Sequence, residues 1–121
     1  MNAQFQSTWE IYASAWKVDT KEEKLALFDQ SLAPECTYRD PLIVAEGWDA
    51  LAMYMLEFHN MIPGGHFVTR EFKAHNSRSI AEWDMCAGDG SIVGIGISYG
   101  EYNSKGLLVS MTGFFETPTS G

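Results

Sequence analysis

Two residues in the first half of the chain, Tyr38 and Asp40, have the types and spacing to move a proton. They lie two positions apart in a β-prone segment, residues 36–40, so both side chains are expected on one face of a strand. A carboxylate that faces an apolar interior is suited to act as a general base near neutral pH. The alternative is structural, because an Asp before a proline, here Pro41, commonly accepts hydrogen bonds from the amides of a turn.

The three histidines are further candidates for acid–base chemistry. His59 falls in a helical pattern, His66 follows a Pro-Gly-Gly turn, and His75 ends a predicted strand. No H-x-H or H-E-x-x-H spacing connects them, so no metal site is predicted. His75 could work as an acid or base at a pocket mouth, although a surface or core histidine is the simpler expectation.

Motifs for binding a cofactor are absent from the sequence. Gly94-Ile95-Gly96 lies inside a predicted strand and opens no helix, so it is not a dinucleotide-binding fingerprint, and there is no phosphate-binding loop or Gly-x-Ser-x-Gly motif. We therefore expect no cofactor. Cys36 and Cys86 have no C-x-x-C neighbour and are expected to be buried free thiols.

An alternating pattern in residues 79–87 predicts a strand with one apolar and one acidic face. Trp83 and Met85 alternate with Glu82 and Asp84. The apolar face is expected to line a pocket or simply to belong to the core, and the acidic face to point outward or to a dimer contact. A register shift of one residue would exchange the two faces and turn Asp84 inward as a second proton carrier.

Three amphipathic helices are predicted to position these candidates. A helix over residues 4–17 is indicated by aromatic residues at spacings of four, three and four, namely Phe5, Trp9, Tyr12 and Trp16. The capping box from Thr20 to Glu23 begins a second helix that ends near Leu32. A third helix is predicted by a wide apolar stripe, made up of Trp48, Leu51, Ala52, Met55, His59 and Ile62.

Everything after Pro63-Gly64-Gly65 is predicted to be strand and turn. The expected strands follow residues 36–40 and are His66–His75, Ser79–Ala87, Ile92–Tyr102 and Leu107–Glu116. Glycines inside the third of these indicate that the sheet curls. The predicted fold is one α+β domain over residues 1–121, cone-shaped, with three helices on a strongly curved, mainly antiparallel mixed sheet that encloses a hollow. Candidate side chains for contacting a ligand there are Trp16, Tyr38, Met55, His59, Trp83 and Met85.

The element order and four segments resemble the nuclear transport factor 2-like superfamily, and within it the SnoaL-like proteins related to polyketide cyclases and ketosteroid isomerases. The segments are the Trp9–Trp16 helix, residues 32–41, the Glu46–Leu51 helix start and Thr112-Gly113-Phe114-Phe115. The resemblance implies a cystatin-like cone and gives Asp40 the role of general base.

The same resemblance gives Tyr12 the role of hydrogen-bond donor to an oxyanion and His75 that of an acid or base. The interval from Tyr12 to Asp40 is longer than in the isomerases, and an aromatic stripe is more often core. Ser110 stands where the isomerases carry a buried carboxylic acid.

Composition limits the partners. A net charge of -8 and a pI near 4.7 argue against nucleic acid, no apolar stretch would span a bilayer, and the N-terminal residues do not read as a signal peptide, so we expect a cytoplasmic protein. A homodimer is predicted because the outer sheet face is apolar, through Ile80, Cys86, Ile95, Ile97, Leu108 and Phe114.

Two hypotheses of function remain open at the level of sequence. In the first, the protein is a cofactor-free isomerase, cyclase or dehydratase-type lyase in which Asp40 takes a proton from a carbon next to a carbonyl, and Tyr12, Tyr38 or His75 stabilises the enolate. In the second, the cone holds a small apolar or aromatic molecule without changing it. A second polar group within reach of the same ligand atom as Asp40 would favour catalysis.

Overall fold

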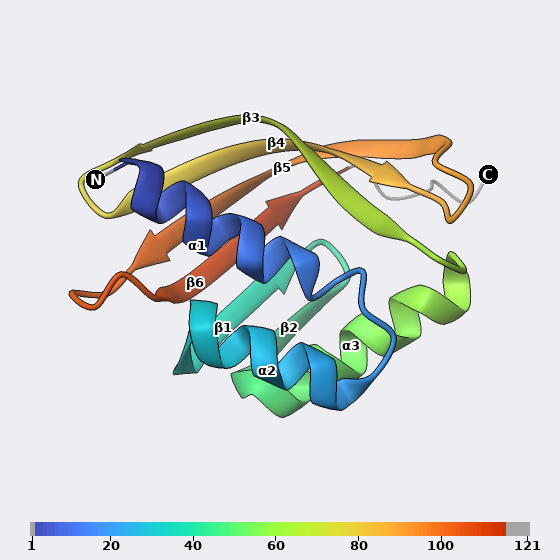
Figure 1. Ribbon diagram of the computed structural model, residues 1–121, viewed down its shortest axis with the longest axis horizontal. Helices are drawn as coiled ribbons and strands as arrows, with labels where there is room; N and C mark the ends of the chain where they lie inside the picture. The colour runs from blue at the N-terminus through green and yellow to red at the C-terminus, as the bar shows by residue number, and fades with distance from the viewer. Residues whose placement is uncertain (1, 116–121) are drawn as a thin grey trace.

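The computed structural model describes residues 2–115 and has three helices packed on one side of a six-stranded sheet. The helices are α1 (Asn2–Ser14), α2 (Lys21–Ser31) and α3 (Gly47–Met61). Figure 1 shows α1 running beneath the long strands, with α2 and α3 beside the first two strands. No helix among these residues is long and apolar enough to cross a membrane.

The first two helices meet at a junction that is held by buried side chains. α2 begins at the predicted capping box, where Thr20 Oγ1 accepts a hydrogen bond from the Glu23 amide (3.1 Å). α1 ends at Ser14, three residues earlier than the pattern predicted. Trp16 therefore lies in the connecting turn, which leaves carbonyl groups at the end of α1 without a helical partner.

Lys24 and His59 satisfy those carbonyl groups. The Lys24 side chain is fully buried, and its Nζ donates to the carbonyl oxygens of Ala15 (2.8 Å) and Val18 (2.6 Å). His59, on α3, lies within hydrogen-bond distance of the Trp16 carbonyl through Nε2, which must carry the proton because a carbonyl only accepts. All three helices are thereby joined at the point where Trp16 enters the core.

The strands form one sheet in the order β2-β1-β6-β5-β4-β3. The bounds are β1 (Leu32–Asp40), β2 (Ile43–Glu46), β3 (His66–His75), β4 (Arg78–Cys86), β5 (Ile92–Tyr102) and β6 (Leu108–Phe114). Strands β3 to β6 form the predicted antiparallel meander, whereas β1 is parallel to β6. The predicted end of the last strand, Glu116, lies outside the described residues.

Two elements at the start of the sheet differ from the prediction. β1 starts four residues early, at Leu32, and β2 was not predicted. Its four residues pair with residues 37–40 across the turn at Pro41. A segment of that length carries too little periodicity to be distinguished from the lead-in to α3.

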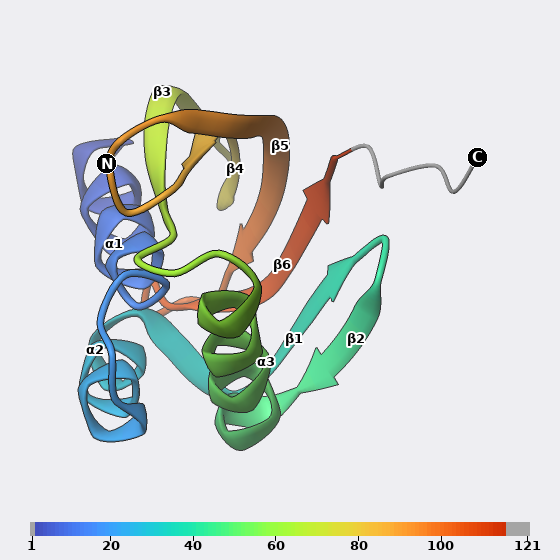
Figure 2. The ribbon, with the colours of Figure 1, turned by 90° about the vertical axis from the view of Figure 1, so that its right-hand side faces the viewer.

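The sheet bends strongly, as the sequence predicted. Figure 2 shows β5 and β6 curving away from the β1–β2 hairpin, with the helices on the concave side. Gly96 explains part of this shape, because a Cβ there would lie 2.3 Å from the Trp83 ring and 2.8 Å from the Phe114 carbonyl oxygen. The glycine therefore lets the Trp83 indole lie flat across β5.

The predicted outer face of the sheet is correct for four residues and wrong for two. Ile80, Ile95, Ile97 and Phe114 are exposed, whereas Cys86 and Leu108 are buried in the core. Each error coincides with a β-bulge. The pairing of β4 with β5 shifts register between Met85 and Cys86. The pairing of β5 with β6 shifts register between Glu101 and Tyr102, and Tyr102 is the partner of Leu108. At each shift the alternation of inward and outward side chains reverses. Both cysteines are free and buried, as predicted.

Candidate functional site

A cavity of about 330 Å³ opens on the concave side of the sheet. Its wall is mainly aromatic and comes from α1 and the turn after it, β1, α3, β3, β4 and the residue after β6, namely Tyr12, Trp16, Tyr38, Tyr54, Phe58, Phe67, Trp83 and Phe115. Leu42, Met61 and Val93 also line it and are more than half exposed, so they form its rim. The volume is at the low end for small-molecule sites, which suits one or two rings better than four.

The polar end of the cavity is the carboxylate of Asp40, at the end of β1. Oδ1 accepts hydrogen bonds from the amides of Leu42 (2.8 Å) and Ile43 (3.2 Å), so it holds the β1–β2 turn. Oδ2 accepts from the hydroxyl groups of Tyr38 (2.6 Å) and Tyr54 (2.8 Å). All four partners donate, and a carboxylate has about four acceptor positions, so these contacts occupy the acceptor capacity of Asp40.

The two interpretations of Asp40, as a turn residue and as a candidate general base, each apply to a different oxygen atom of its carboxylate. Oδ1 makes the turn contacts that an Asp before a proline is expected to make. Oδ2 accepts from two phenols that themselves line the cavity, which meets the criterion of a second polar group near the candidate base.

The phenols around Asp40 are held in their neutral form. Burial raises the pKa of Tyr38 well above its usual value, and the nearby charge of Asp40 adds to this effect. The pKa of Tyr54 is raised by burial and by its hydrogen bond to Asp40, and that of Tyr12 by burial. These tyrosines can therefore donate or accept hydrogen bonds, but they are not proton donors near neutral pH.

Trp16 forms the centre of the aromatic wall. Its ring lies 5.7 Å from that of Tyr38, 6.0 Å from Tyr54 and 5.2 Å from Phe67, measured between centroids. The His59 contact to its carbonyl oxygen fixes the turn that carries this ring. His59 itself does not line the cavity, so it positions Trp16 and does not reach a ligand.

Trp83 and Met85 line the cavity from β4, on the apolar face that the sequence predicted. The Trp83 indole Nε1 donates to Ser98 Oγ (2.9 Å), which leaves the Ser98 hydroxyl hydrogen free for another acceptor. Asp84 points to the opposite face, where its Oδ1 lies 2.8 Å from Arg70 Nε. Asp84 therefore does not provide a second carboxylate in the cavity.

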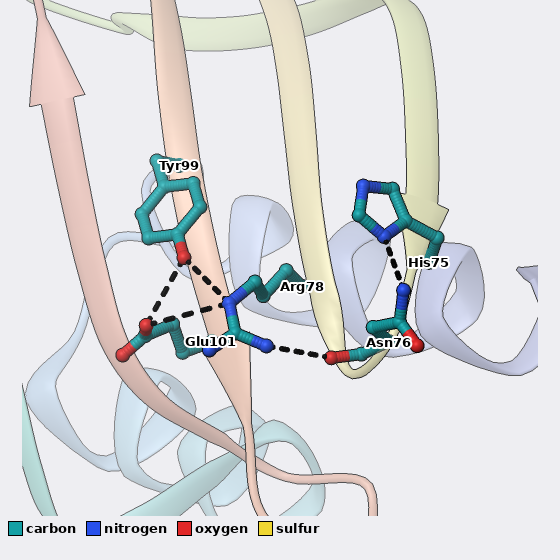
Figure 3. A network of polar contacts seen from close by, with 5 residues as sticks. All are labelled: His75, Asn76, Arg78, Tyr99 and Glu101. Carbon is teal, nitrogen blue, oxygen red and sulfur yellow. Dashed lines mark hydrogen bonds and ion pairs between the residues drawn. The ribbon is translucent and has the colours of Figure 1, made fainter.

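The structure brings Asp40, Tyr12, Tyr38, Trp16, Trp83 and Met85 together and leaves three predicted site residues outside the lining. Met55 is fully buried in the core, and His59 holds the Trp16 carbonyl. His75 lies at the exposed end of the β3–β4 hairpin, where its Nδ1 accepts from Asn76 Nδ2 (2.9 Å). Figure 3 shows it beside a cluster of Arg78, Tyr99 and Glu101 at this end of the sheet.

Sequence reasoning missed Tyr54, although it contacts the same Asp40 oxygen as Tyr38. Tyr54 lies three residues after Leu51 and so adjoins the apolar stripe predicted for α3, but it is not one of the residues that defined the stripe. The signal that could have identified Tyr54 is its spacing, because it lies between Leu51 and Phe58 on the face of a helix that packs on β1. Glu57, at the cavity rim, was missed because an exposed helical Glu carries no distinguishing pattern.

Comparison with known proteins supports the fold. A SnoaL-like family protein from Agrobacterium tumefaciens, to which an isomerase activity is attributed, superimposes with a TM-score of 0.86 and 25% identity, over 95% of this chain and 99% of that one. No protein-family model matches the sequence, and no curated protein matches it significantly.

Two more distant structures have the same architecture. A protein of unknown function with a cystatin-like fold from Methylobium petroleophilum has a TM-score of 0.77 and 14% identity over 99% of this chain and 80% of its own. A SnoaL-like protein from Jannaschia, to which polyketide cyclase activity is attributed, has a TM-score of 0.75 and 11% identity over 95% and 87%. The chain thus has the nuclear transport factor 2-like, SnoaL-like fold, which occurs with many activities.

Proposed function

We propose that this chain is a small-molecule-pocket protein of the SnoaL-like kind, which holds a compact ligand with an apolar or aromatic body. The observation that carries the proposal is the cavity of about 330 Å³, with aromatic walls and one polar end formed by Tyr38, Asp40 and Tyr54. Concave, mainly apolar sites with a few convergent polar groups are the usual form of ligand pockets.

Retention of the ligand, without chemical change, is the function that the contacts of Asp40 favour. Every acceptor position of the carboxylate is already used, and a proton arriving at Oδ2 would displace a phenol. Proton transfer next to a carbonyl is the second candidate. It is favoured by the two hydroxyl groups on Oδ2, because Tyr54 could turn from Asp40 to the enolate oxygen as Asp40 takes the proton.

The ketone 2-tetralone tests both candidates in one sample. It has two rings and acidic hydrogens beside its carbonyl group. We expect it to quench the fluorescence of Trp16 and Trp83, which line the cavity. Gly94→Leu should weaken its binding about tenfold or more, because the added side chain would start beside Met85 with no backbone strain and fill the cavity.

The matched control is Ile95→Leu, which changes an exposed residue next to Gly94 and should leave binding unchanged. Equal binding by both variants would contradict the pocket proposal. Deuterium exchange at the carbons next to the carbonyl, followed by NMR, separates the two candidates. Retention alone predicts the same exchange rate for the wild type and Asp40→Asn, and an acceleration that Asp40→Asn removes would establish proton transfer.

We also propose that the outer sheet face is covered by a second copy of the chain. Ile80, Ile95, Ile97 and Phe114 are each between 43% and 61% exposed, and Ile97 is paired with Phe114 across neighbouring strands. Contiguous apolar area of this kind on a sheet is typical of an interface. Light scattering should give twice the chain mass of 13.5 kDa.

Ile95→Lys should shift that mass to 13.5 kDa, because a charge would be placed in the apolar contact. Met53→Lys, at an equally exposed position on α3, serves as the control and should leave the mass unchanged. A wild-type chain that stays monomeric at high concentration would exclude the dimer.

A further inference from the structure

The charges that line the cavity have one sign. Among residues 2–115, the charged residues that line it are Asp40, at the polar end, and Glu57, at the rim, and no Lys, Arg or His of this range contributes to the wall. None of the ion pairs among the described residues includes either carboxylate. Within the described part of the chain, the cavity therefore carries negative charge that no ion pair neutralises.

The hydrogen-bonding groups beside Asp40 are oriented as acceptors. The hydroxyl hydrogens of Tyr38 and Tyr54 are both donated to Asp40 Oδ2. These phenols can therefore only accept a hydrogen bond from a ligand, through their oxygen lone pairs. An anionic or enolate oxygen placed here would meet a carboxylate and two committed donors. A group that carries N–H donors, or a positive charge, would meet complementary partners.

The walls are also suited to a cation. Aromatic rings carry negative charge on their faces, and several rings around one space can replace the hydration of an alkylated ammonium group. Here Trp16 packs edge-on against Phe58 (5.5 Å) and Phe67 (5.2 Å), and Trp83 against Phe67 (4.9 Å), so the rings meet at different angles around the cavity.

We infer that the ligand of this cavity is an organic cation, a protonated or quaternary alkylated amine attached to an apolar or aromatic body. The ammonium group lies at the Tyr38–Asp40–Tyr54 end and the body lies against the aromatic wall. The inference rests on the proposed function, because it requires the cavity to be a ligand site. The inference specifies the charge of the ligand, which the proposed function leaves open.

Two probes of the same shape test the charge directly. Phenyltrimethylammonium and tert-butylbenzene differ in one central atom, nitrogen for carbon, and therefore in charge but hardly in size. We expect the cation to bind at least about tenfold more tightly than the neutral probe, as measured by quenching of Trp16 and Trp83 fluorescence. Asp40→Asn should weaken the cation about tenfold and the neutral probe less than about twofold.

Two further variants keep the test independent of how Asp40→Asn folds. Glu57→Gln, at the exposed rim, should weaken the cation about twofold, because solvent screens that charge. Asp29→Asn removes the same charge from an exposed position on α2 away from the cavity and should change nothing. If the neutral probe binds as tightly as the cation, the inference is overturned and the pocket proposal stands. If neither probe binds at millimolar concentration, both are overturned.

Discussion

Replacing Lys24 with alanine is expected to lower the free energy of unfolding by about 3 kcal/mol. The substitution leaves the Ala15 and Val18 carbonyl oxygens buried without their donor, and it opens a cavity where a fully buried side chain was. Urea denaturation followed by circular dichroism measures the change. Because these carbonyls end the turn that carries Trp16, the variant should also weaken binding in the cavity.

Lys21→Ala is the matched control for this experiment. Lys21 lies on the same helix, but its ion pair with Asp49 (3.3 Å) is between exposed side chains, so its loss should cost no more than about 0.5 kcal/mol. Lys24→Met, which restores most of the volume but not the donor, should fall between the two. A loss below about 1 kcal/mol for Lys24→Ala would show that water or other groups satisfy the carbonyls.

Stability is expected to fall steeply above pH 10. Burial raises the pKa of Tyr12 and Tyr38 and raises that of Tyr102 to about 12, whereas tyrosines in the unfolded chain ionise near 10. The folded state therefore keeps protons that the unfolded state releases, so this contribution is complete below pH 10 and is lost above it. Between pH 9 and pH 11 the three groups together should cost about 4 kcal/mol.

Denaturation at pH 9, 10 and 11 measures this slope. Lys24 has the opposite effect on the pH dependence of stability, because burial lowers its pKa below 10.5 and the folded state loses this proton at a lower pH than the unfolded state. Its contribution therefore makes stability rise with pH, and it stops changing once the unfolded chain has lost the same proton. Tyr102→Phe removes one of these phenols and with it the hydrogen bond to Ser79 (2.8 Å). Because burial also raises the pKa of Tyr54 and of the Cys36 thiol, the variant should lose about a quarter of the slope. A stability that is constant from pH 9 to pH 11 would contradict the assignment.

The sequence predicts the elements well where periodicity is strong. The aromatic spacing of α1, the capping box at Thr20 and the alternation around Trp83 each depend on neighbours within one element, and each is confirmed. The same local rules fail where two strands must be compared. The bulges that turn Cys86 and Leu108 inward exist only in the pairing of β4, β5 and β6, so no pattern within one strand reveals them.

The candidate site was predictable in part for a related reason. Tyr38 and Asp40 share a face of one strand, so their contact follows from a spacing of two. Tyr54 joins them from α3, and that meeting depends on how the helix is rotated against β1. The resemblance to the SnoaL-like proteins predicts His75 as an acid or base at the pocket mouth, which the structure does not bring about. β3 contributes Phe67, near its start, to the cavity lining, whereas His75 is at the other end of the same strand.

The parallel pairing of β1 with β6 has a consequence for how the protein folds during its synthesis. Tyr38 faces Met111 across the two strands, so the hairpin that carries Asp40 gains its neighbour in the sheet only when β6 is present. While the ribosome is still making residues 108–114, the earlier hairpin has no partner on that edge and the pocket cannot close. The pocket therefore forms only after β6 has been made, and a nascent chain that stalls before β6 exposes an open strand edge to aggregation.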